Sequence, residues 1–205
     1  MIKVEWLDIR RLTEREAALV AERMPARYER AQKFLHEEDR LRCIGAGLLM
    51  LRLGLRDEGD IVYGPHGKPE VAYLPPFNLS HSGDFVVMAT GEGPRSGAPA
   101  AEALVGVDVE RPRPCKRNVA ARVFTAQEIA WMDQEDSDQR FCQLWTCKEA
   151  VMKLFGEGFH MEPRSFDVMA LVRGDTLLID GVEVSARFEE REGHTLCATT
   201  TAPGA

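Results

Sequence analysis

The chain has 205 residues, enough to bury a sizeable core in one domain or in two small ones. Its formal net charge of −7 disfavours general binding to nucleic acid or to an anionic membrane. The opening residues are charged throughout, unlike a signal peptide, and the longest apolar stretch, residues 44–51, is far too short to span a bilayer. Five scattered cysteines without a Cys-x-x-Cys pair indicate reduced thiols, so we expect a cytoplasmic protein without sulfur-ligated metal.

The first half of the sequence predicts one strand, then helices, then further strands. The apolar periods predict a strand over 2–9, helices over 13–24 and 26–53, short strands near residues 61, 71 and 77, and a strong strand over 85–90. Residues 92–101 are rich in Gly, Pro and Ala and have no apolar period, which predicts a linker.

The second half repeats this order of elements. It predicts a strand over 104–110, helices near 118–124, 125–133 and 137–155, and strands near 166–172, 176–179, 182–188 and 195–200. The repeated order predicts an α+β fold of two similar halves, residues 1–102 and 103–205, although their sequences share negligible identity.

Two acids alternate into the apolar strand Gly106-Val107-Asp108-Val109-Glu110. Side chains at i and i+2 of a strand point the same way, so Asp108 and Glu110 share a face. Taken alone, the pattern also fits a solvated strand edge. Its apolar surroundings favour burial, and buried acids need partners or a cation.

The segment Trp145-Thr-Cys-Lys-Glu-Ala-Val-Met-Lys153 predicts a helix on which Trp145, Glu149 and Lys153 form one stripe. An exposed Glu–Lys pair is the alternative reading, and apolar neighbours weigh against it. If the helix faces the acidic strand, three carboxylates and an ammonium would form a site for a hard metal and for phosphate.

These two segments together resemble the signatures of the 4′-phosphopantetheinyl transferases of the surfactin-synthetase-activating (Sfp) type. Three weaker features of that family occur upstream in the expected order. They are a basic-to-acidic helical entry from Arg27 to Arg42, a Gly-Lys-Pro turn around Lys68, and the block Phe77-Asn-Leu-Ser80-His81-Ser82. The resemblance implies two similar α/β halves with the active site in the cleft between them.

The resemblance implies transfer of 4′-phosphopantetheine from coenzyme A to a serine of an apo carrier protein, with release of adenosine 3′,5′-bisphosphate. Asp108, Glu110 and Glu149 would hold Mg²⁺, and Lys153 would neutralise charge on phosphate. Because the attacking serine comes from the partner, Glu149 is also the best candidate for its general base. Asp108, Glu149 and Lys153 are therefore the expected catalytic residues.

Coenzyme A would be gripped at a distance from the reacting bond. By the resemblance, Arg27, Arg30 and His81 would hold the 3′-phosphate, Lys68 would lie on the adenine-nucleotide side, and Ser80 would touch the nucleotide. Each has a structural alternative: a solvated helix face, a satisfied histidine, an ordinary turn and a strand-end hydrogen bond.

Two further residues have structural alternatives that the sequence leaves open. Trp145 is expected to pack the core beneath the acids. Thr125 to Glu128 fits a capping box, although the family places an acid near the cofactor here.

The expected partner is an apo acyl or peptidyl carrier protein, and we expect a monomer that binds neither nucleic acid nor membrane. A basic cluster could dock an acidic carrier, or could be a solvated loop; it comprises Arg111, Arg113, Lys116, Arg117 and Arg122. Two rival functions stay open, a coenzyme A hydrolase and a degenerate module that binds carrier protein without catalysis.

Overall fold

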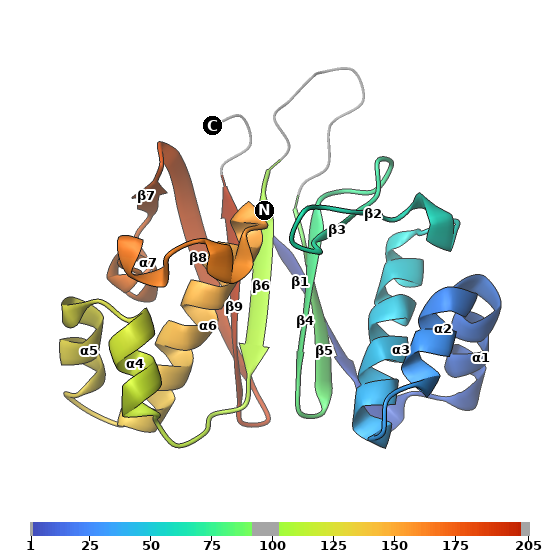
Figure 1. Ribbon diagram of the computed structural model, residues 1–205, viewed down its shortest axis with the longest axis horizontal. Helices are drawn as coiled ribbons and strands as arrows, with labels where there is room; N and C mark the ends of the chain where they lie inside the picture. Colours follow the sequence, from blue (N-terminus) through green and yellow to red (C-terminus); the bar gives the residue numbers. More distant parts are fainter. Residues whose placement is uncertain (1, 92–102, 202–205) are drawn as a thin grey trace.

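The computed structural model describes residues 2–91 and 103–201. Two antiparallel sheets lie at the centre and helices cover their outer faces (Figure 1). The expected linker at 92–101 and the junction between the predicted halves lie outside the described residues. In the part of the chain that the structure describes, no helix is both long and apolar enough to cross a membrane.

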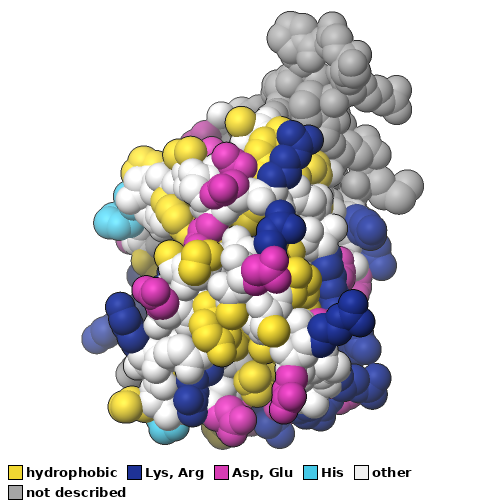
Figure 2. Space-filling view, turned by 90° about the vertical axis from the view of Figure 1, so that its right-hand side faces the viewer, with side chains coloured by type: hydrophobic (Ala, Val, Ile, Leu, Met, Phe, Trp, Pro, Cys, Tyr) yellow, Lys and Arg dark blue, Asp and Glu magenta, His cyan; other side chains and the backbone are white. Residues whose placement is uncertain are grey.

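The first sheet has the strand order β1-β5-β4. β5 (Phe85–Thr90) lies between β1 (Lys3–Asp8) and β4 (Phe77–Ser82), and it pairs antiparallel with both. Three helices cover its outer face, namely α1 (Glu14–Arg23), α2 (Pro25–Gln32) and α3 (Glu37–Leu53) (Figure 1). A small hairpin of β2 (Val62–Tyr63) and β3 (Pro69–Glu70) precedes β4. On the face over these helices, basic and acidic side chains are interspersed with apolar ones (Figure 2).

The second sheet has the order β6-β9-β8-β7 and is also antiparallel. Its strands are β6 (Val105–Glu110), β7 (Leu177–Ile179), β8 (Val182–Arg191) and β9 (His194–Thr201). The long helix α6 (Ser137–Phe155) packs on β6 and β9, and the shorter helices are α4 (Arg117–Val123), α5 (Ala126–Met132) and α7 (Met169–Val172).

Three apolar clusters hold these layers together. One lies between α1–α3 and the first sheet, and a second surrounds α6 on the outer face of the second sheet. The third lies between the sheets and consists of small and branched side chains: Val87, Ala89, Val105, Val107, Val109, Leu196 and Ala198. The predicted α+β class with two similar halves is confirmed; the boundary at residue 102 stays a prediction.

One predicted helix is divided in two. Residues 26–53 were expected to be continuous, whereas α2 ends at Gln32 and α3 begins at Glu37. His36 has an extended backbone at φ −93° and ψ 138°. The apolar residues Phe34 and Leu35 suggested continuity, yet the side chain of Leu35 is 92% exposed, so no burial holds a helix together there.

The strand predicted near 166–172 is wrong. Residues Met169–Val172 form α7 instead. The backbone N–H of Val168 donates to Glu128 at 2.8 Å and that of Met169 donates to Asp167 at 2.9 Å, so side chains take the hydrogen bonds that a strand would make along a ladder. The apolar run is buried against the core around α6 rather than in a sheet.

Gly106 allows α6 to approach β6 closely. A Cβ atom built at Gly106 would lie 2.0 Å from the carbonyl oxygen of Ala150 and 2.6 Å from the backbone nitrogen of Leu154. Both are backbone atoms, so neither can move away as a flexible side chain would. The approach places the helix stripe of Glu149 and Lys153 against the acidic face of β6.

We predict that Gly106→Ala destabilises the fold by about 1–3 kcal/mol or more, because the added methyl group forces β6 and α6 apart. Urea unfolding followed by circular dichroism would measure this. Gly64→Ala is the matched control, since its added Cβ would lie 3.7 Å from the nearest backbone atom, an ordinary contact. Equal stability of the two variants would contradict the close approach.

Candidate active site

β4 and β6 run side by side where the two sheets meet (Figure 1). β6 pairs through its backbone with β9 on one edge. On its other edge, backbone N–H groups donate to side chains of β4: Val107 to Asn78 at 3.0 Å, Val109 to Ser80 at 3.4 Å and Arg111 to Ser82 at 3.2 Å. We call this set of contacts the β4–β6 seam. It closes the boundary between the halves with side chains rather than with a strand ladder.

Asp108 lies beside this seam and is only 3% exposed. Its Oδ1 accepts hydrogen bonds from Lys153 Nζ at 2.6 Å and from Ser80 Oγ at 2.8 Å. Its Oδ2 is buried and has no hydrogen-bond partner among the described residues. A buried carboxylate oxygen without a partner is costly, so this atom is available to a ligand.

Glu110 and Glu149 complete an acidic cluster with Asp108. Burial, and then the charge of Asp108, raise the pKa of Glu110, while the hydrogen bond from Ser82 at 3.0 Å opposes this. Burial raises the pKa of Glu149 to about 7; Lys153 opposes this shift, and Asp108 and Glu110 add to it. The structure therefore brings together the four residues whose side-chain directions were inferred from the periods of a strand and a helix.

Lys153 is the one ammonium group in this cluster. Burial lowers its pKa, but the adjacent charge and hydrogen bond of Asp108 outweigh burial and raise it. Three carboxylates thus share one ammonium group, with Arg113 as a further positive charge near Glu110, so carboxylates outnumber cations. Among residues 2–91 and 103–201, no three Asp, Glu, His or Cys side chains are already drawn together around a point that could hold a metal. Side chains would have to rotate to enclose one.

The residues expected at the 3′-phosphate fall into two places. Arg27 is buried and its Nη1 lies 3.4 Å from the carbonyl oxygen of Cys43, while Arg30 Nη2 lies 3.8 Å from Cys43 Sγ. His81 lies instead beside Arg42 and Lys153, whose charges add to burial in lowering its pKa. Arg42 was not among the predicted site residues. It donates to the carbonyl oxygen of Gly83 at 2.6 Å, which places a further basic side chain near the end of β4.

Lys68 joins the two halves at the start of β6. Its Nζ donates to the carbonyl oxygens of Val105 at 3.1 Å and Leu154 at 2.9 Å. Burial lowers its pKa to about 8, and Glu70 opposes this shift. The structure thus places Lys68 near the first residue of β6, while Glu110 is the last residue of that strand.

Glu128 belongs to the core of the second half. The predicted capping box is present, and the fully buried Glu128 carboxylate accepts from Thr125 N at 2.7 Å and forms an ion pair with Lys148 at 3.0 Å. Lys148 also donates to the carbonyl oxygens of Pro163 at 2.6 Å and Phe166 at 2.5 Å. These hydrogen bonds attach the segment 163–166 to α6. They support the interpretation of Glu128 as a structural residue.

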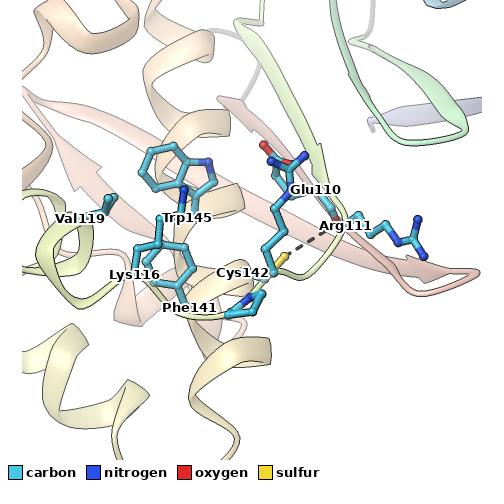
Figure 3. Close-up of a pocket in the computed structure, with 9 residues that line it drawn as sticks. Glu110, Arg111, Lys116, Val119, Phe141, Cys142 and Trp145 are labelled. Atoms are coloured by element: carbon cyan, nitrogen blue, oxygen red, sulfur yellow. Dashed lines mark hydrogen bonds between the residues drawn. The ribbon is translucent and has the colours of Figure 1, made fainter. Parts of the chain in front are cut away.

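A pocket of about 200 Å³ adjoins the acidic cluster at Glu110 (Figure 3). Its wall on α6 includes Trp145 and Phe141, whose stacked rings have centroids 6.1 Å apart. Trp145, which was expected to pack the core, packs against the core around α6, but it is only partly buried and also lines the pocket. The other lining residues are Arg111, Arg113, Pro114, Lys116, Val119 and Cys142. The pocket therefore combines aromatic walls with basic residues and one acid.

The fold thus consists of two α/β halves, and acidic side chains lie where they meet. The family model described as the 4′-phosphopantetheinyl transferase superfamily matches residues 104–199. A Bacillus subtilis 4′-phosphopantetheinyl transferase is 30% identical over 184 residues, which cover 84% of this chain and 73% of that protein. The chain belongs to the 4′-phosphopantetheinyl transferase family and is Sfp-like.

Two other relatives are matched over shorter stretches. The 4′-phosphopantetheinyl transferase Sfp of Bacillus subtilis strain 168 is 30% identical over 155 residues, or 70% of this chain and 65% of that protein. The 4′-phosphopantetheinyl transferase AcpT of Salmonella typhimurium is 37% identical over 118 residues, or 54% of this chain and 57% of that protein. The chain thus spans less than two thirds of the length of these two relatives.

We predict that Lys68 makes stability depend on pH in the alkaline range. Its pKa is about 8 in the folded protein and 10.5 ordinarily, so between these values the unfolded chain binds more protons than the folded one. Stability of the wild type relative to Lys68→Met should therefore rise as pH increases from 8 to 10.5. Urea unfolding across that range would measure the difference, with Lys3→Met as the control at an exposed lysine. A difference that is independent of pH would contradict the prediction.

Proposed function

We propose that the protein transfers 4′-phosphopantetheine from coenzyme A to a serine hydroxyl of an apo carrier protein and releases adenosine 3′,5′-bisphosphate. The observation that carries this proposal is the cluster of Asp108, Glu110, Glu149 and Lys153 where the halves meet, in which Asp108 is buried and the other three are partly buried. The family relatives named as 4′-phosphopantetheinyl transferases support the same reaction.

The cluster fits Mg²⁺, with Asp108, Glu110 and Glu149 as its oxygen ligands. Three observations support this: the unpartnered Oδ2 of Asp108, the raised pKa values of the two glutamates, and an excess of carboxylates over ammonium groups. Hard carboxylate oxygens are the ligands that Mg²⁺ prefers. When bound, the ion would supply positive charge to the pyrophosphate oxygens of coenzyme A.

Glu149 and Lys153 perform the parts of the reaction that need protein groups. The serine oxygen forms a bond to the phosphorus that bears pantetheine, and the bond from that phosphorus to the bridging oxygen breaks. Glu149 accepts the serine proton as the general base. Lys153 neutralises charge that develops on the phosphate oxygens.

Coenzyme A is held by basic residues on the first half. Arg27 and Arg30 bind the 3′-phosphate together with His81, and Arg42 is a further basic residue beside His81. Ser80, which accepts a hydrogen bond from Lys153, contacts the nucleotide of coenzyme A. Lys68 serves the nucleotide side once its ammonium leaves the carbonyl oxygens of Val105 and Leu154.

The carrier protein approaches over the pocket beside Glu110. The exposed basic residues at and beyond its rim, namely Arg111, Arg113, Lys116, Arg117 and Arg122, offer a local positive surface on an acidic chain. Such a surface suits an acidic carrier. We further propose that the protein acts as a monomer in the cytoplasm; all five cysteines lie in the described residues and are free thiols, as a reducing compartment would keep them.

The decisive test is mass spectrometry of an apo acyl carrier protein and an apo peptidyl carrier protein after incubation with this protein, coenzyme A and Mg²⁺. We expect one of them to gain the mass of one phosphopantetheine group. Coenzyme A should stay intact when the carrier is omitted. Cleavage without carrier would instead indicate a hydrolase, and carrier binding without modification would indicate a binding module.

Substitutions separate metal binding from proton removal. Asp108→Ala and Glu110→Ala should lower the apparent affinity for Mg²⁺, so that excess Mg²⁺ restores part of the rate. Glu149→Gln keeps an oxygen ligand but removes the base, and should lose about a hundredfold in kcat with little recovery. Steady-state kinetics over a range of Mg²⁺ concentrations would measure this. Full recovery of Glu149→Gln by Mg²⁺ would reduce Glu149 to a ligand.

A further inference from the structure

The three β4 side chains of the β4–β6 seam differ in what they can do. Asn78, Ser80 and Ser82 each accept one backbone N–H of the neighbouring strand. A serine hydroxyl can donate a hydrogen bond while it accepts another, whereas the amide oxygen of asparagine only accepts. Both serines use this capacity: Ser80 donates to Asp108 at 2.8 Å and Ser82 donates to Glu110 at 3.0 Å. Asn78 makes the seam contact without touching an acid of the cluster.

The two acids of β6 depend on these hydroxyl groups to different degrees. Asp108 has Lys153 as a second partner, at 2.6 Å, and keeps an ionic anchor if Ser80 is removed. For Glu110, the hydrogen bond from Ser82 is the one that its carboxylate receives in the part of the chain that the structure describes. Glu110 is also the last residue of β6, and its side chain lines the pocket (Figure 3).

Ser82 is itself fixed firmly enough to hold another group. It is 7% exposed, and its hydroxyl oxygen accepts the backbone N–H of Arg111 at 3.2 Å. It lies at the end of β4, directly before Gly83, whose carbonyl oxygen accepts from Arg42 at 2.6 Å. Its position is therefore set by the backbone of both halves.

We propose that Ser82 is a positioning residue that holds the Glu110 carboxylate in place for a divalent cation. This makes the geometry of a ligand on the second half depend on a hydroxyl group from the first half. The inference rests on the proposed function, because it assumes that Glu110 is a metal ligand. Groups that orient a metal ligand typically contribute tenfold or more to metal affinity.

The experiment measures binding of Mn²⁺, as a stand-in for Mg²⁺, to the full chain without substrate by electron paramagnetic resonance. Ser82→Ala should weaken Mn²⁺ binding about tenfold. Ser82→Thr keeps the hydroxyl group and should bind within about twofold of the wild type, since both the donor and the acceptor are retained. Asn78→Ala is the matched control, because it loses a seam contact of the same kind but no contact to an acid. It should bind Mn²⁺ as the wild type does.

Urea unfolding of all variants separates positioning from stability. Ser82→Ala and Asn78→Ala should both lose stability, so a difference in Mn²⁺ affinity between them cannot come from a weaker seam. If Ser82→Ala and Asn78→Ala bind Mn²⁺ equally well, the role of Ser82 is overturned. The proposed metal site would still stand if the wild type binds Mn²⁺ and Asp108→Ala does not. Failure of the wild type to bind Mn²⁺ at all would overturn both. If Ser82→Ala does not fold, weak binding by Ser82→Thr would overturn the proposal and retained binding would support it.

Discussion

The site depends on one electrostatic constraint: one buried carboxylate, Asp108, and two partly buried ones, Glu110 and Glu149, share a single ammonium group. Such charge is expensive in a protein interior unless it is paired or hydrogen-bonded. Lys153 forms an ion pair with Asp108, and the hydroxyl groups of Ser80 and Ser82 on β4 donate hydrogen bonds to Asp108 and Glu110. Two groups stay without full compensation: the Oδ2 of Asp108 has no hydrogen-bond partner among the described residues, and the pKa of Glu149 is raised to about 7. A cluster left short of positive charge in this way is suited to cations and to the protons of a reacting hydroxyl.

The fold serves this cluster through two close approaches. Gly106 lets α6 contact β6 at backbone distance, which brings the Glu149 and Lys153 stripe to the acids. On the other side, the β4–β6 seam fixes the first half against the same strand. Each half also has its own apolar core, and a third cluster of small and branched side chains, against which Trp6 packs, lies between the sheets. The directional contacts at the junction include the seam beside the site and, farther along, the hydrogen bond from Trp6 to Glu189 at 2.8 Å.

The periodic elements could be predicted and the local exceptions could not. Helix α6 was predicted with the bounds that the structure has, because a 3.6-residue period and a following glycine mark it clearly. The strand expected near 166–172 is wrong because an apolar run without a period also fits a short buried helix. Glu128, distant in sequence, accepts the backbone N–H of Val168 directly before that helix. The sequence pattern placed Asp108, Glu110, Glu149 and Lys153 together. It could not show that Lys68 reaches two carbonyl oxygens, because those contacts depend on how the halves dock. Nor could it show that His81 lies beside Arg42, because that contact depends on how α3 packs on the first sheet.

The seam has a further consequence for how copies of this chain meet one another. An unpaired strand edge is a template on which another chain can add a strand, and this is a common route to aggregation. β6 has such an edge opposite β9, and it is rich in valine. Because Asn78, Ser80 and Ser82 already occupy its N–H groups, a second chain finds no free donors at these positions. The contacts that join the halves therefore also protect the protein against intermolecular β-sheet formation along this strand.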